Sequence, residues 1–155
     1  MPSTSRICVR ASLAYLAVGA VLGALLLINR WLPLGAWVYA LKISHVQFLI
    51  VGWLTQFILG VGWWLFPPLQ LGRQPDGTMA RRGQATRGSE SLFWMTLGLL
   101  NTGVLLRGLG APLQVWTHQD WPRAASGLSG FFLLAAAIAF VLNIWARIRA
   151  LGRGA

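Results

Sequence analysis

The chain has 155 residues, of which 56% are hydrophobic and 10% are charged, a composition typical of an integral membrane protein and not of a soluble domain. Its 13 basic and three acidic residues give a formal charge of +10. The basic residues lie outside the apolar runs, where anionic lipid headgroups account for them, so nucleic acid is not expected as a partner. A single cysteine and three scattered acids exclude an internal disulfide, a thiolate cluster and a paired-carboxylate active site.

The first apolar run predicts a transmembrane helix over residues 11–29. Arg6 and Arg10 precede this run, and no small-x-small cleavage signal ends it, so we expect an uncleaved helix instead of a removed signal peptide. Gly19 and Gly23 form a GxxxG pair within it. Such a pair indicates either an ordinary small-residue contact in a crowded bundle or a seam between two chains.

The second predicted helix covers residues 36–66 and includes an uncharged stretch that rises roughly 30 Å, the thickness of the hydrocarbon core of a bilayer. His45 lies just outside the apolar part of this helix. Four further residues fall within about 60° of it on a helical wheel, namely Gly52, Gln56, Gly60 and Trp63. One face therefore carries an imidazole, small residues and an amide, and we expect it to contact something close-packed and partly polar.

A polar segment is predicted over residues 69–89, followed by a third helix over residues 90–108. Arg107 ends the apolar run of this helix. Asn101 lies near its middle, where a side-chain amide should face another helix or a ligand and not lipid.

Residues 108–123 contain His118 together with prolines and tryptophans, which favours an interfacial or re-entrant loop. The fourth predicted helix covers residues 124–147. The fold class is therefore all-α, with residues 1–155 forming a single domain that is a four-helix bundle in the lipid bilayer.

The distribution of basic residues predicts the orientation of this bundle. Nine of the 13 lie in the two terminal segments and the 69–89 segment, and the other four are Arg30, Lys42, Arg107 and Arg123. By the positive-inside rule, both termini are cytoplasmic in a bacterial inner membrane. His45 and His118 then lie on the same, external side.

His45 has surroundings of the kind that a b-type haem requires, namely small residues to admit the macrocycle and basic groups to meet the propionates. We expect Gly52 and Gly60 to provide the room. Arg107, or one of the other external basic residues Arg30, Lys42 and Arg123, is expected to contact a propionate. His118 is a candidate second iron ligand if its loop folds inward. Alternatively His45 ligates the iron alone, or only caps a helix at the interface. Trp53 lies deep enough to pack against such a cofactor or within an ordinary core.

The segment comprising His45-x-Gln47, Gly52-Trp53, Gln56, Gly60 and Leu65-Phe66-Pro67 resembles a helix of haem-copper oxidase subunit I. The same pattern occurs in small four-helix proteins described as oxidase-subunit-I-like and in NnrS-type haem proteins. In these relatives the first histidine of the helix binds a low-spin haem, so the resemblance implies that His45 is an axial ligand. Gln47 replaces the second histidine of the pattern and points about 200° away from His45, which leaves one ligand on this segment.

The leading hypothesis is a small membrane haem b protein, resembling a fragment of oxidase subunit I, that transfers single electrons or senses a gas or the redox state. A binuclear haem-copper centre needs several more histidines than the two present, so the chain holds no complete catalytic centre. One ligand per chain favours a homodimer, and Gln56, Asn101 and His45 could alternatively form a quinone site. The competing hypothesis is a non-catalytic accessory or assembly subunit that packs into a larger respiratory complex through its glycine faces.

Overall fold

The computed structural model describes residues 2–66 and 88–151 of the chain, and most of the polar segment predicted over residues 69–89 lies outside them. Helices alone make up the regular structure of the described residues. In chain order they are α1 (Ser3–Trp31), the 3₁₀ helix η1 (Ala36–Leu41), α2 (Lys42–Gln47), the π-helix η2 (Phe48–Thr55), α3 (Gln56–Leu65), α4 (Glu90–Thr117) and α5 (Trp121–Leu151). The elements from η1 to α3 follow one another without a break and form one rod, which we call the second rod.

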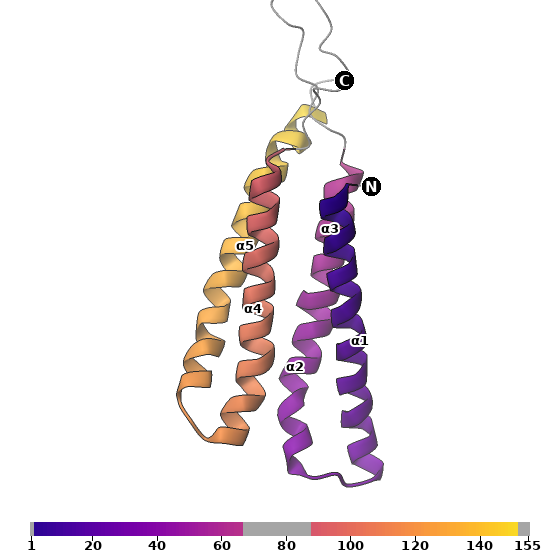
Figure 1. Cartoon of the computed structure of the whole chain (residues 1–155), viewed down its shortest axis with the longest axis vertical. Helices are drawn as coiled ribbons and strands as arrows, with labels where there is room; N and C mark the ends of the chain where they lie inside the picture. The colour runs from indigo at the N-terminus through magenta and orange to yellow at the C-terminus, as the bar shows by residue number, and fades with distance from the viewer. Residues whose placement is uncertain (1, 67–87, 152–155) are drawn as a thin grey trace, which may run out of the picture.

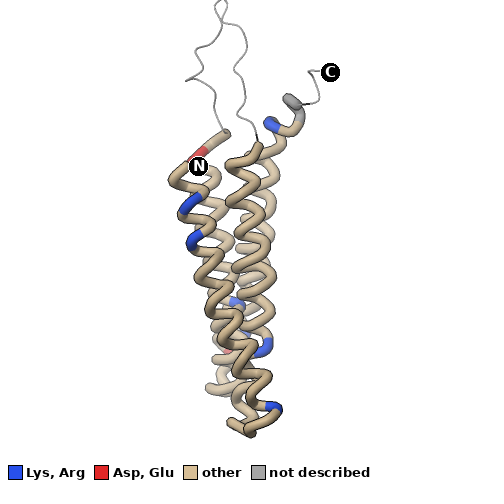
Figure 2. The backbone as a smooth tube through the Cα atoms, turned by 90° about the vertical axis from the view of Figure 1, so that its right-hand side faces the viewer, with Lys and Arg blue, Asp and Glu red and all other residues tan. Residues whose placement is uncertain are grey.

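The four rods α1, the second rod, α4 and α5 are each long and apolar enough to cross a membrane. They run antiparallel, so both termini of the described chain lie at the same end of the bundle (Figure 1). α1 packs along the second rod, α4 packs along α5, and α4 also contacts the second rod and so joins the two pairs. Basic residues lie toward both ends of the bundle (Figure 2). The prediction of an all-α, four-helix, multi-pass membrane protein is confirmed.

The predicted first and fourth helices were too short. α1 begins at Ser3 and not at residue 11, because Arg6 and Arg10 are exposed near a helix end and their long side chains do not interrupt the backbone ladder. α5 covers Trp121–Leu151 and not residues 124–147, since a proline is tolerated in the first turn of a helix. The second rod, Ala36–Leu65, agrees with the prediction to within one residue.

The predicted loop over residues 108–123 is wrong, because α4 continues to Thr117 and includes Pro112. A proline has no backbone N–H, so the carbonyl of Gly108, four residues earlier, loses its helical partner. The hydroxyl of Ser44 replaces it and donates to the Gly108 oxygen at 2.5 Å. The ring of Phe48 lies so close to Gly108 that an added Cβ would be 2.3 Å from the Phe48 Cε1 atom. The second rod therefore supplies the hydrogen bond that Pro112 cannot make, at the point where the sequence alone predicts that the helix ends.

Glycines bring α1 and the second rod together at nearly backbone distance. A Cβ added to Gly19 would lie 2.7 Å from a methyl group of Leu49, and one added to Gly23 would lie 2.6 Å from the imidazole of His45. These separations are shorter than real Cβ contacts, so a larger residue at either position would have to displace the Leu49 or His45 side chain. The GxxxG pair thus serves a contact within the chain.

Arg147 joins α5 to the end of the second rod by hydrogen bonds. Arg147 is 1% exposed, and its guanidinium donates to the carbonyl oxygens of Trp63 and Phe66, which lie in the last turn of α3 and directly after it. The same guanidinium lies 5.3 Å from the ring centroid of Trp63. Helix C-termini present carbonyls without helical partners, so a cation there satisfies several acceptors at once.

Candidate functional site

His45 is the predicted site residue with the most specific environment. It lies in α2, is half-buried, and packs against Gly23 of α1. Its Nδ1 atom is 2.8 Å from the carbonyl oxygen of Gly19. Because a carbonyl oxygen can only accept, Nδ1 carries the proton and the neutral ring has its lone pair on Nε2. This is the tautomer of a metal-binding histidine that is oriented by a backbone carbonyl.

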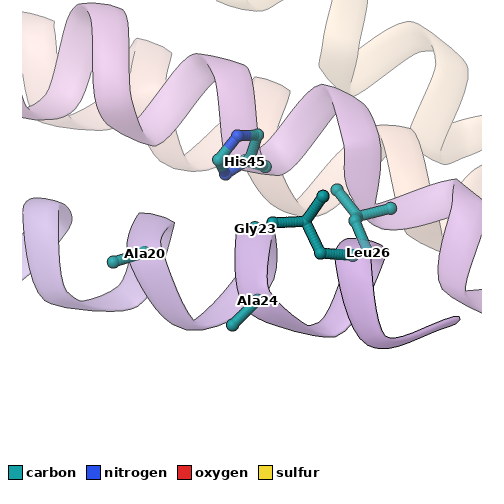
Figure 3. Close-up of a pocket in the computed structure, with 6 residues that line it drawn as sticks. Ala20, Gly23, Ala24, Leu26 and His45 are labelled. Atoms are coloured by element: carbon teal, nitrogen blue, oxygen red, sulfur yellow. The ribbon is translucent and has the colours of Figure 1, made fainter. Parts of the chain in front are cut away.

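A groove of about 480 Å³ opens beside the imidazole, between α1 and α2. Its wall is made of small and apolar residues of α1, namely Ala20, Gly23, Ala24, Leu26 and Leu27 (Figure 3). Ala20, Ala24 and Leu27 are exposed, so the groove opens onto the outer surface of the bundle. Its size falls within the range of ordinary cofactor sites, roughly 300 to 1,000 Å³.

The glycines that we expected to admit a macrocycle are already in contact with α1. A Cβ on Gly52 would lie 2.6 Å from the ring of Tyr15, and one on Gly60 would lie 3.1 Å from Cys8. The expectation that these glycines provide the cofactor cleft is therefore corrected, because helix packing within the chain uses the space. The room near His45 comes instead from the small residues of α1, which the periodicity of the second helix alone cannot indicate.

Gln56 forms a reciprocal pair with Cys8 at the same contact between the two rods. Its side chain is fully buried, and its Nε2 atom donates to the carbonyl of Cys8 at 3.3 Å. The Cys8 thiol donates to the backbone carbonyl of Gln56 at 3.2 Å. Gln56 therefore holds α1 against the second rod and does not line the His45 groove.

Asn101 faces another helix, as its depth predicts, but its partner was not anticipated. The hydroxyl of Tyr15 donates to Asn101 Oδ1 at 2.8 Å, and Asn101 Nδ2 donates to the carbonyl of Leu97 at 2.7 Å. A tyrosine within an apolar run gives no sequence signal for such a bond. His45, Gln56 and Asn101 thus bond to three different partners instead of converging on the quinone site considered above.

His118 is not brought to His45. It directly follows α4, has a left-handed backbone with φ of 54°, and its N–H caps the helix by donating to the carbonyl of Gln114. Its side chain is exposed. Gly108, which bonds to the neighbour of His45 in α2, lies ten residues earlier, or roughly 15 Å along the helix axis. The condition for His118 as a second ligand, an inward fold of its loop, is not met, because most of this segment is the last part of α4.

Arg107 and Trp53 also lie away from the His45 groove. Arg107 is exposed and lines a different groove, between α4 and α2, together with Lys42 and Gln47. Trp53 is half-buried in the π-helix η2 and is not part of the groove wall. Among the predicted site residues, His45 alone lines the groove between α1 and α2.

The donor set near His45 restricts the kind of metal that it can hold. Across residues 2–66 and 88–151, no group of three or more His, Cys, Asp or Glu side chains is close enough to bind a metal ion. A haem differs in this respect, because its porphyrin supplies four ligands and the protein needs to supply only one or two. An imidazole with a fixed Nδ1–H beside an apolar groove fits that requirement.

The fold and the groove define a multi-pass α-helical membrane protein with a single oriented histidine at a helix–helix contact. Comparison with protein-family models, curated proteins and solved structures finds no match for the chain. The resemblance to oxidase subunit I stays a hypothesis from the sequence of the second helix.

Proposed function

We propose that the chain is a small membrane b-type haem protein in which His45 is an axial ligand through Nε2. The observation that carries the proposal is the 2.8 Å contact between His45 Nδ1 and the Gly19 carbonyl, which orients the ring and leaves Nε2 for a metal. A bound haem would supply one-electron redox chemistry or diatomic gas binding, so the proposed role is electron transfer or gas and redox sensing.

The chain's own residues would position and shield the cofactor. The Gly19 carbonyl holds the proton on Nδ1 and thereby increases the basicity of Nε2. Gly23 allows the ring to lie directly on the α1 backbone. Ala20, Ala24 and Leu27 present an apolar wall that keeps water away from the ligand. Because these wall residues are exposed, a second copy of the chain or another subunit would close the groove, which favours a homodimer.

The orientation is part of the same proposal. Both ends of the described chain lie at one end of the bundle, and most of the basic residues of the sequence belong to the terminal and central segments. The positive-inside rule then supports cytoplasmic termini in a bacterial inner membrane, with His45 toward the external leaflet.

Titration of haemin into the purified apo-protein in detergent tests the proposal. We expect the wild type to give a Soret band that saturates at one haem per chain, or at one per two chains if two copies share it. His45→Ala should lose the band, and Gly23→Ala should weaken binding about 10- to 100-fold, since it displaces the ring without removing the ligand. His118→Ala is the matched control and should bind as the wild type does. Equal saturation by His45→Ala would contradict the proposal.

A second candidate, a non-catalytic accessory or assembly subunit of a respiratory complex, is favoured by a different observation. The glycine faces at Gly52 and Gly60 are occupied by α1, so a partner complex would have to pack against another surface. α5 packs mainly against α4 and leaves large apolar side chains exposed, among them Phe131, Leu134 and Leu142. Native gel separation of mildly solubilised membranes distinguishes the two functions. Co-migration of wild type and His45→Ala alike with a cofactor-containing complex supports the accessory role, whereas haem bound to the isolated chain opposes it.

A further inference from the structure

A second groove, of about 400 Å³, lies between α2 and α4 and is distinct from the His45 groove. It is lined by Lys42, Ile43, Val46, Gln47 and Arg107. The two cationic side chains come from different helices and are both exposed. The groove thus combines two basic groups with two aliphatic ones at the surface of a helix bundle that spans a membrane.

The two cations have no acidic neighbour in the described part of the chain. Its acids are Glu90 and Asp120, which lie toward opposite ends of α4. Glu90 precedes Arg107 by 17 residues, or roughly 25 Å of helix, and Asp120 lies beyond the last turn, roughly 15 Å or more in the other direction. Charges near the hydrocarbon region are costly without a counter-charge, so a bound anion would stabilise these two side chains.

Gln47 adds a third donor to the same groove. Its Nε2 atom is buried and has no hydrogen-bond partner within the described residues. A buried amide N–H without a hydrogen-bond partner destabilises the folded protein. A donor of this kind therefore indicates that a bound molecule supplies the acceptor. An ammonium, a guanidinium and an amide N–H₂ together match the oxygen atoms of a phosphate group.

The apolar residues of the groove continue along the bundle toward its middle. Ile43 and Val46 are 45% and 50% exposed, and Ile50 and Leu54, further along the second rod, are exposed as well. A row of exposed aliphatic side chains that begins beside two cations has the polarity of a phospholipid, with its headgroup at one end and its chains at the other.

We propose that this groove binds the phosphate headgroup of an anionic glycerophospholipid. Lys42 and Arg107 contact the phosphate oxygens, Gln47 donates to the same group, and one acyl chain lies along Ile43, Val46 and Ile50. The site uses no residue of the His45 groove, so it does not depend on haem binding.

Native mass spectrometry of the full-length protein in detergent, with matched phosphatidylglycerol and phosphatidylcholine, tests the proposal. The wild type should prefer phosphatidylglycerol. Each cation near an anionic headgroup favours binding enough to change the affinity about fivefold, so the double variant Lys42→Gln/Arg107→Gln should bind phosphatidylglycerol about 30-fold more weakly. The matched control, Arg30→Gln/Arg123→Gln, removes the same charge from the predicted external side but lies outside the groove, and should keep the preference.

Three results would overturn the proposal. One is a wild type without lipid preference, and another is an equal loss in the control variant, which would indicate general charge attraction. The third is complete displacement of the lipid by millimolar inorganic phosphate, which would indicate a site for soluble phosphate. Gln47→Leu keeps every charge and should weaken phosphatidylglycerol binding about fivefold, so it tests the site even if the double variant misfolds. His45→Ala should retain the lipid preference, so failure of the haem proposal is recognised separately.

Discussion

The contact between Gly23 and His45 makes a quantitative prediction for Gly23→Ala. The new Cβ would lie 2.6 Å from Cε1 and 2.9 Å from Nδ1 of the imidazole, whereas ordinary contact begins at 3.4 Å. The ring must therefore retreat by about 0.8 Å, which stretches its 2.8 Å hydrogen bond to the Gly19 carbonyl. Overpacking of this kind costs about 1 to 3 kcal/mol, and an interhelical hydrogen bond in a membrane contributes about 0.6 kcal/mol.

Unfolding of the protein in mixed micelles by increasing SDS, followed by far-UV circular dichroism, measures this cost. We expect Gly23→Ala to lower the free energy of unfolding by about 1 to 3 kcal/mol relative to the control Gly98→Ala. Gly98 lies in α4, and a Cβ there meets no heavy atom within 4 Å, so the control reports only the change in helix propensity.

A double-mutant cycle with His45→Ala shows whether the imidazole is the cause. Alanine at position 45 removes the ring, so Gly23→Ala should then cost almost nothing, and the two substitutions should couple by about 1 kcal/mol or more. If the two free-energy changes add within about 0.5 kcal/mol, the imidazole does not pack on Gly23 and the geometry of the candidate site is refuted.

Two further predictions concern hydrogen bonds between the rods. Ser44→Ala leaves the Gly108 carbonyl without a partner and should destabilise the wild type by about 1 to 2 kcal/mol. The loss should be smaller in a Pro112→Ala background, because the restored N–H of residue 112 can bond to that carbonyl. Equal losses in both backgrounds would show that the Ser44 hydroxyl does not replace the missing helical hydrogen bond of α4. Tyr15→Phe removes the donor to Asn101 and should cost about 0.6 to 2 kcal/mol in the same assay, and an unchanged SDS midpoint would show that this bond contributes nothing.

The four rods could be predicted from sequence because few backbone structures can span a bilayer. A helix satisfies its own backbone groups, so length and apolar composition suffice to identify each span. Continuation of α4 through Pro112 could not be predicted in the same way, because the replacement donor, Ser44, belongs to another helix. Arg147 is a similar case, since its charge predicts topology while its burial against Trp63 depends on how α5 packs.

The candidate site was predictable only in part for the same physical reason. Periodicity identified a face of the second helix with His45, Gly52 and Gly60, and it correctly indicated close packing. It could not identify what packs there, because Tyr15 and Cys8 come from α1. The groove beside His45 likewise depends on small residues of α1 that periodicity in the second helix does not reveal.

The reduced-minus-oxidised absorption spectrum of the protein purified from haem-replete membranes shows whether His45 ligates a haem. We expect an α-band typical of a b-type cytochrome in the wild type and in His118→Ala, and no band in His45→Ala. Absence of the band from haem-replete wild type, or its persistence in His45→Ala, would contradict the assignment of His45 as the axial ligand.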